Sequence, residues 1–118
     1  MRIYIVGSVG SGKTTLARRI SELTGVPFYS LDEVVHTEDP SGSWGNRKRS
    51  DAERDTLFYG ILAESDYIME DAGRECFIEG MRRADIVILL EIPLWVRRKI
   101  RSLTRTDEAD SLFWGLVQ

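Results

Sequence analysis

Eight consecutive residues near the amino terminus have the types and spacing that bind the phosphates of a nucleotide. Residues 7–14 read Gly-Ser-Val-Gly-Ser-Gly-Lys-Thr and match the pattern G-x-x-x-x-G-K-[ST] at each fixed position. Glycines let backbone N–H groups converge on phosphate oxygens, because no Cβ stands in the way. Lys13 would reach the β- and γ-phosphates, and the Thr14 hydroxyl would ligate Mg²⁺. We therefore predict that ATP and Mg²⁺ bind through Gly7, Ser8, Val9, Gly10, Ser11, Gly12, Lys13, Thr14 and Thr15.

Three acidic residues follow predicted strands, at the sheet edge where ligands bind in open α/β folds. Asp32 follows a short strand and could orient an acceptor hydroxyl or hold a Mg²⁺ water, although it could instead cap a helix. Glu70 and Asp71 end a later strand, where a carboxylate would contact Mg²⁺ through water. Adjacent side chains of a strand point to opposite faces, so only one of the two would meet the metal. Asp71 is the preferred candidate, and a solvated turn is the alternative for both.

Arginines form the second group of candidates. The planar fork of Arg74 could bind an anionic acceptor, but a surface arginine at a helix start is the plain alternative. Residues 93–106 contain five basic residues and no acidic residue. From a lid, Arg97 and Arg101 would neutralise phosphate charge during transfer. A solvated basic face is the alternative, and a nucleic-acid patch is the weaker one.

Alternating strands and helices would position all of these residues. Strand patterns cover residues 1–7, 28–31, 67–69 and 86–92. Helical patterns cover residues 13–24, 50–64, 74–84 and a segment that begins near residue 93, and residues 37–49 are expected to form a mobile loop. This alternation predicts an α/β fold with a parallel sheet covered on both faces, in the strand order 2-3-1-4.

Two helices have predicted inward faces. Ser50 and Glu53 form a capping-box signature that would begin the second helix. The inward residues are expected to be Leu16, Ile20 and Leu23 in the first helix, and Leu57, Ile61 and Leu62 in the second.

The composition is that of a globular protein, and it limits the partners. The chain has 118 residues, 42% of them hydrophobic and 30% charged, and we expect one domain over residues 1–118. A net charge of −3 gives no general attraction to nucleic acid or membrane. The single cysteine, Cys76, excludes an internal disulfide, and we expect a cytoplasmic protein. His36 lacks neighbours at ligand spacing, so no further metal site is expected.

The order and spacing of four segments resemble a known family. Residues 5–17, 29–32, 68–77 and 84–94 are similar to the adenylate- and shikimate-kinase-like group, and most of all to the DNA topology modulation proteins. The resemblance implies a three-layer P-loop NTPase fold. It also implies transfer of the γ-phosphoryl group of Mg·ATP to a small acceptor, with nucleosides and nucleotides among the candidates.

One departure from the family pattern leaves alternatives open. Members of this group continue with a fifth strand and a closing helix after the arginine-rich region, and this sequence does not contain them. We therefore expect a fragment or a shortened member, which could bind ATP without turnover. A nucleic-acid-associated ATP-binding protein is the third hypothesis. An uncovered edge at strand 86–92 would favour a homo-oligomer.

Overall fold

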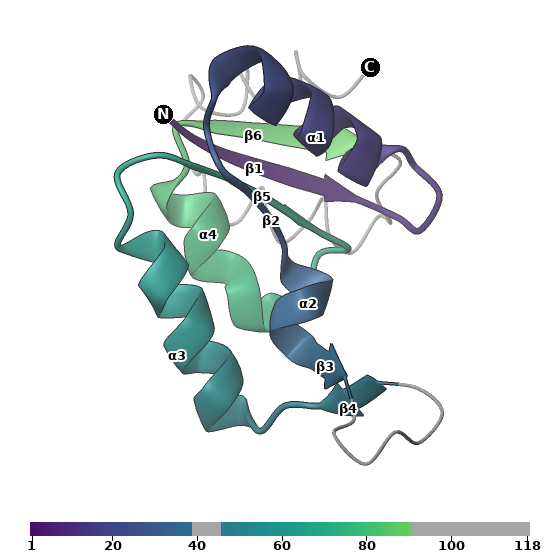
Figure 1. Cartoon of the computed structure of the whole chain (residues 1–118), viewed down its shortest axis with the longest axis vertical. Coiled ribbons are helices and arrows are strands. Elements are labelled where there is room, and N and C mark those ends of the chain that lie inside the picture. Colours follow the sequence, from purple (N-terminus) through teal and green to yellow (C-terminus); the bar gives the residue numbers. More distant parts are fainter. Residues whose placement is uncertain (39–45, 91–118) are drawn as a thin grey trace, which may run out of the picture.

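The computed structural model describes residues 1–38 and 46–90. Within these ranges a sheet of four parallel strands has the order β2-β5-β1-β6 (Figure 1). The strands are β1 (Arg2–Gly7), β2 (Phe28–Ser30), β5 (Tyr67–Asp71) and β6 (Ile86–Leu90). The predicted α/β class and the predicted 2-3-1-4 order are thus confirmed.

The register of the sheet brings the ends of its strands to one edge. Val6 pairs with Asp71 on one side of β1, and Gly7 pairs with Leu90 on the other. Ser30, the last residue of β2, pairs with Glu70. The loop after β1 therefore lies beside the last residues of β5 and β6, with the end of β2 one strand farther along the same edge, where ligands bind in parallel sheets.

One face of the sheet is covered by α1 (Lys13–Thr24). Ala17 packs there on the strand residues Ile3, Ile5 and Ile68, and Leu16 and Ile20 join this cluster. The prediction for the third inward residue was wrong, because Leu23 is exposed. The helix ends one residue later, where Gly25 has a φ of 75° and closes the last turn on the carbonyl of Ser21.

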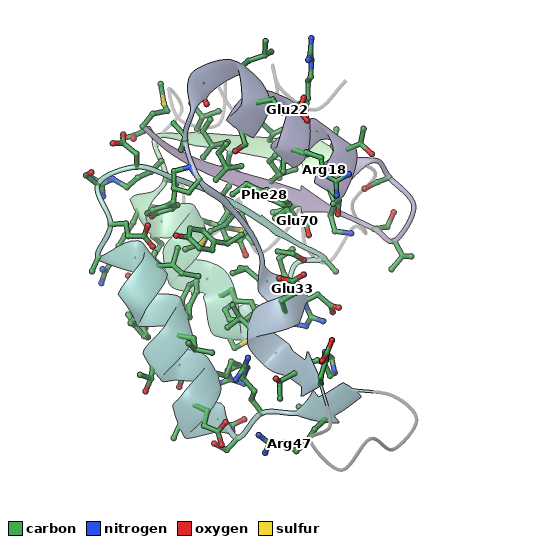
Figure 2. The ribbon with its side chains drawn as sticks, viewed as in Figure 1. Arg18, Glu22, Phe28, Glu33, Arg47 and Glu70 are labelled. Atoms are coloured by element: carbon green, nitrogen blue, oxygen red, sulfur yellow. The ribbon has the colours of Figure 1, made fainter. Side chains whose placement is uncertain are left out.

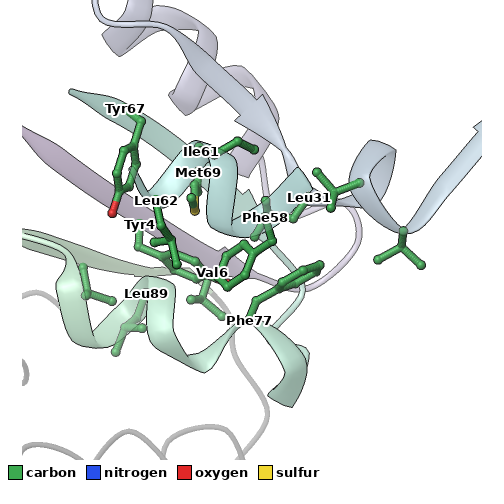
Figure 3. Packing of buried hydrophobic residues seen from close by; sticks show 13 residues of the cluster. Tyr4, Val6, Leu31, Phe58, Ile61, Leu62, Tyr67, Met69, Phe77 and Leu89 are labelled. Carbon is green, nitrogen blue, oxygen red and sulfur yellow. The ribbon is translucent and has the colours of Figure 1, made fainter. Parts of the chain in front are cut away.

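The opposite face carries the larger core and the remaining helices. These are α2 (Leu31–Val35), α3 (Asp51–Leu62), the 3₁₀ turn η1 (Glu75–Phe77) and α4 (Ile78–Arg83). The Phe58 and Phe77 rings lie 4.7 Å apart in this core (Figure 3). The predicted cap of α3 is confirmed, since Ser50 accepts a hydrogen bond from the Glu53 N–H. Leu57 is exposed and Phe58 is buried in its place, so that part of the predicted face was wrong.

A glycine lets α4 approach the centre of the sheet. A Cβ on Gly80 would lie 2.5 and 2.8 Å from two ring carbons of Tyr4, closer than packed atoms come. Tyr4 is fully buried in the middle of β1. The backbone of Gly80 is ordinary helix, so glycine is required here by its packing against Tyr4 and not by an unusual φ.

A small antiparallel ribbon replaces part of the predicted loop 37–49. Strand β3 (His36–Glu38) pairs with β4 (Asn46–Lys48), while residues 39–45 lie outside the described ranges. The helix expected after residue 93 and the candidates Arg97 and Arg101 also lie outside them. In the part of the chain that the structure describes, no helix has the length and apolarity to cross a membrane.

Candidate functional site

The segment between β1 and α1 has the backbone of a phosphate-binding loop. Gly10 and Gly12 have φ values of 81° and 88°, in the left-handed region that favours glycine. The Ser11 N–H donates to the Ser8 carbonyl oxygen at 3.1 Å and closes the turn. Gly12 is the residue before α1, and no side chain caps the helix there. The first N–H groups of α1 are therefore available to an anion.

Gly7 is required by close packing, although its φ is ordinary. A Cβ at this position would collide with Ser11 Oγ and would lie 2.8 Å from the carbonyl oxygen of Leu90. The hydroxyl of Ser11 is buried and has no hydrogen-bond partner in the structure. The loop thus folds tightly over the end of β1, and Val9 and Gly10 are exposed at its tip.

The amino group of Lys13 lies between the loop and the end of β5. It donates to the Ser8 carbonyl oxygen at 3.4 Å and lies 4.0 Å from Glu70 Oε2. Only 3% of Glu70 is exposed, and among the described residues its Oε2 has no hydrogen-bond partner. A buried carboxylate oxygen without a partner is costly, and a bound ion or ligand is one physical reason for such a group. Figure 2 labels Glu70 at the end of β5, between α1 and α2 in that view.

Glu70 and Asp71 point to opposite faces of the sheet. Ile68, two residues before Glu70, belongs to the cluster under α1, whereas Met69, two residues before Asp71, belongs to the cluster under α3. Because strand side chains alternate, Glu70 shares its face with the phosphate-binding loop. Thr14 and Thr15 lie exposed in the first turn of α1, on the same side.

Asp71 is bound to its own turn and to Arg74. Its Oδ2 accepts hydrogen bonds from the N–H groups of Gly73 at 2.9 Å and Arg74 at 2.7 Å. Its Oδ1 pairs with Arg74 Nη1. Gly73 has a φ of 104°, which explains the glycine in this turn. The carboxylate of Asp71 is thus fully buried and satisfied by three donors.

Arg74 connects Asp71 to Asp32. Its Nη2 donates to Asp32 Oδ1 at 2.9 Å, across 42 positions of sequence. Burial alone would lower the pKa of Arg74, but the charges and hydrogen bonds of Asp71 and Asp32 outweigh burial and raise it. Asp32 lies in the first turn of α2, after the N-cap residue Ser30, and His36 Nδ1 lies 3.7 Å from Asp32 Oδ1.

The structure therefore brings together most of the residues that the sequence singled out. The loop 7–14, Glu70, Asp71, Asp32 and Arg74 meet at the carboxyl edge of the sheet. The contact between Arg74 and Asp32 was not predicted, since nothing in the sequence indicates a pair so far apart. In the described ranges, no cluster of three histidine, cysteine or acidic residues could hold a metal ion by itself.

Comparison with solved structures identifies the fold. A shikimate kinase from Aquifex aeolicus superposes with a TM-score of 0.56 at 19% identity, covering 98% of this chain and 82% of that chain. The shikimate kinase from Acinetobacter baumannii, solved in complex with shikimate, gives a TM-score of 0.54 at 23% identity, with 98% and 73% covered. The chain has the P-loop fold of the shikimate kinases.

Sequence comparison gives relatives of the same kind over shorter stretches. The chain is 35% identical over 75 residues to the bifunctional shikimate kinase/3-dehydroquinate synthase of Thermotoga maritima, a match that covers 64% of this chain and 14% of that protein. It is 40% identical over 70 residues to the shikimate kinase of Marinomonas sp., with 54% and 37% covered. The chain thus matches well under half the length of these relatives. No family model matches the sequence. The resemblance to the DNA topology modulation proteins stays a hypothesis.

Proposed function

We propose that this protein is a P-loop kinase that transfers the γ-phosphoryl group of ATP to a hydroxyl group of a small-molecule acceptor. The observation that carries the proposal is the pairing of Lys13 with Glu70 across the phosphate-binding loop. The two charged groups lie 4.0 Å apart, and in the part of the chain that the structure describes the buried Glu70 keeps one oxygen without a hydrogen-bond partner. This arrangement suits a site that a nucleotide and its metal complete.

The residues present fit Mg·ATP. The loop 7–14 would surround the phosphates with N–H groups, and Lys13 would neutralise phosphate charge. The Thr14 hydroxyl and the Glu70 carboxylate would hold Mg²⁺, the latter through water. Geometry favours Glu70 over Asp71 for this role, because Asp71 already has three donors and lies on the other face. Bound Mg·ATP would supply the phosphoryl group and the charge that stabilises its transfer.

Asp32 is the candidate for contact with the acceptor hydroxyl. It lies at the same sheet edge, and 65% of its side chain is exposed. A carboxylate there can accept the proton that the attacking hydroxyl loses. Catalysis would otherwise rest on positioning and charge neutralisation, since phosphoryl transfer needs little covalent help from a protein. The names of the relatives make shikimate one compound to test, and the nucleosides and nucleotides expected from the sequence are the others.

Calorimetry and a coupled ADP assay would test this proposal. We expect Mg·ATP to bind the wild-type protein and the control variant Lys48→Ala, which removes an exposed lysine of β4. We expect Lys13→Ala to lose binding, because the amino group within the loop is gone. One member of an acceptor panel should stimulate ADP release in the wild type.

The outcomes separate the open hypotheses. Binding that depends on Lys13, followed by stimulated ADP release, would support a kinase and name its acceptor class. Binding without any ADP release would support an ATP-binding module without turnover. Equal binding by wild type and Lys13→Ala would contradict the role of the loop.

A further inference from the structure

We propose that Arg74 is a positioning residue that the buried Asp71 anchors, and that its second arm presents Asp32 to the acceptor. This inference rests on the proposed function, and it gives Arg74 a different role from the binding of an anionic acceptor. It also assigns Asp71 to the acceptor side of the site and removes it from the metal side.

The anchor is a fixed turn at the end of β5. Asp71 receives two backbone N–H groups and Arg74 Nη1, and none of its side-chain surface is exposed. Both the backbone and the side chain of Arg74 are therefore tied to one carboxylate. A hydrogen-bonded charge pair of this kind is stronger than an exposed ion pair. The guanidinium consequently starts from a defined place and direction.

The second arm of Arg74 reaches Asp32. Nη2 lies 2.9 Å from Asp32 Oδ1, while Nη1 pairs with Asp71. Both ends of the guanidinium fork are thus occupied by carboxylates of this chain, and 32% of the side chain is exposed. An anionic acceptor would compete with Asp32 for Nη2. It would also meet a site whose net charge is negative, because the single positive charge of Arg74 faces the two carboxylates.

Asp32 gains the most from this contact. Its side chain lies largely in solvent, where an aspartate turns freely between rotamers. Arg74 holds one carboxylate oxygen, Oδ1, and His36 Nδ1 approaches the same atom at 3.7 Å. The second oxygen, Oδ2, has no hydrogen bond or ion pair with another described residue and would be the one that meets the acceptor hydroxyl. Holding a reactive group in one orientation lowers the barrier, and an error of about 1 Å in its place can cost on the order of 100-fold in rate.

The substitution Arg74→Lys would separate the contact with Asp71 from the contact with Asp32. A lysine has one ammonium group, which can stay with the buried Asp71 but cannot also present the planar second arm to Asp32. We expect Arg74→Lys to unfold near the wild-type temperature, while its kcat falls about 10- to 100-fold with the KM for ATP unchanged. We expect Arg74→Gln to lose thermal stability as well, because it leaves Asp71 without its charged partner. Arg82→Lys, an exposed arginine paired with Glu79, is the matched control and should change neither property.

A double-mutant cycle with Asp32→Asn tests whether Arg74 acts through Asp32. ADP release is measured with the acceptor that the panel identifies, and with water as the acceptor when the panel identifies none. In the Asp32→Asn background, Arg74→Lys should cause no further loss of rate. Losses that multiply would overturn the inference, because Arg74 would then act separately from Asp32.

Two other results test this inference and the proposed function separately. An unchanged kcat in Arg74→Lys, with Lys13-dependent ADP release intact, would overturn this inference alone. An absence of Lys13-dependent ADP release in the wild type would overturn the proposed function. In that case the thermal unfolding of Arg74→Lys and Arg74→Gln would still measure the anchor. Equal stability of these two variants would contradict it.

Discussion

Replacing the adjacent acids Glu70 and Asp71 by their amides should have opposite effects on the stability of this protein and on its Mg²⁺ requirement. Glu70→Gln and Asp71→Asn each replace one buried carboxylate at the end of β5 by a group of nearly the same shape. The structure gives them different partners. Within residues 1–38 and 46–90, Glu70 has only the Lys13 amino group at 4.0 Å, whereas Asp71 has three hydrogen-bond donors.

The stability of the two variants follows from these partners. At 4.0 Å the attraction between Lys13 and Glu70 is about 1 kcal/mol in water and about 4 kcal/mol at an effective dielectric constant of 20. The cost of burying the two charges is several kcal/mol for each ion, so the pair brings little net stability. We expect Glu70→Gln to change the free energy of unfolding by less than about 1 kcal/mol. Asp71→Asn leaves Arg74 paired with Asp32 alone and removes the charged acceptor of three hydrogen bonds, and a hydrogen bond to a charged group is worth about 1.5 to 3 kcal/mol, so we expect a loss of at least about 2 kcal/mol.

The activity of the variants should differ in the other way. If Glu70 holds Mg²⁺ through water, Glu70→Gln should lose about 10- to 100-fold in activity or metal affinity, as changes to outer ligands do. Asp71→Asn should lose activity mainly through instability and through the misplaced Arg74. Its Mg²⁺ requirement should therefore stay near that of the wild type.

Thermal unfolding and a Mg²⁺ titration of ADP release would check both expectations. Each variant is melted without nucleotide and then assayed at saturating ATP over a range of Mg²⁺ concentrations. A raised Mg²⁺ requirement in Asp71→Asn, with an unchanged requirement in Glu70→Gln, would refute the assignment of the metal to Glu70. A large loss of stability in Glu70→Gln would refute the view that its pairing with Lys13 contributes little.

Three further predictions concern the core and the stability at high pH. Tyr4→Phe should raise the free energy of unfolding by about 1 kcal/mol, because the buried Tyr4 hydroxyl has no hydrogen-bond partner among the residues that the structure describes; a lower melting temperature would contradict this. Gly80→Ala should lower the free energy of unfolding by about 1 to 3 kcal/mol, despite the better helix propensity of alanine, because the new Cβ meets the Tyr4 ring. Gly60→Ala is the control for this melt, since no atom lies within 4 Å of its new Cβ. The hydrogen bond to Glu64 and, to a lesser degree, burial raise the pKa of Tyr29. The Tyr29 hydroxyl therefore stabilises the fold below about pH 10, and this stabilisation is lost as the pH rises through its folded-state pKa. Denaturant unfolding between pH 8 and 11 should therefore show a shallower decline for Tyr29→Phe than for the wild type.

The sequence predicted the sheet and the phosphate-binding loop because both depend on local patterns. Short apolar runs alternating with amphipathic segments permit few topologies other than a parallel sheet. The loop follows from eight contiguous residues. Of its two glycines with a left-handed φ, Gly12 is fixed by the pattern, and Gly10 lies where the pattern allows any residue. The capping of α3 by Ser50 is equally local.

Periodicity failed where two helical phases were equally apolar. In α3 the sequence Leu57-Phe58-Tyr59 offers several large residues, and either Leu57 or Phe58 fits with Ile61 and Leu62 on one face. The contact of Phe58 with Phe77 decides between them, and that contact joins distant segments. The ribbon of β3 and β4 was missed for a related reason, because three-residue strands carry almost no periodic signal.

The alternation of side chains that separates Glu70 from Asp71 also gives the two carboxylates different neighbours at the site. One strand end places consecutive carboxylates on opposite sides of the sheet, so one faces the loop and the other faces the turn that carries Arg74. A shift of β5 by one residue would exchange these positions and leave a carboxylate under α3 without its donors. Burial of Tyr67 and Met69 on the α3 face opposes such a shift. Under the proposed function, the hydrophobic core therefore determines which acid would meet the nucleotide and which would position the acceptor side, and this is why the two amide variants should differ so strongly.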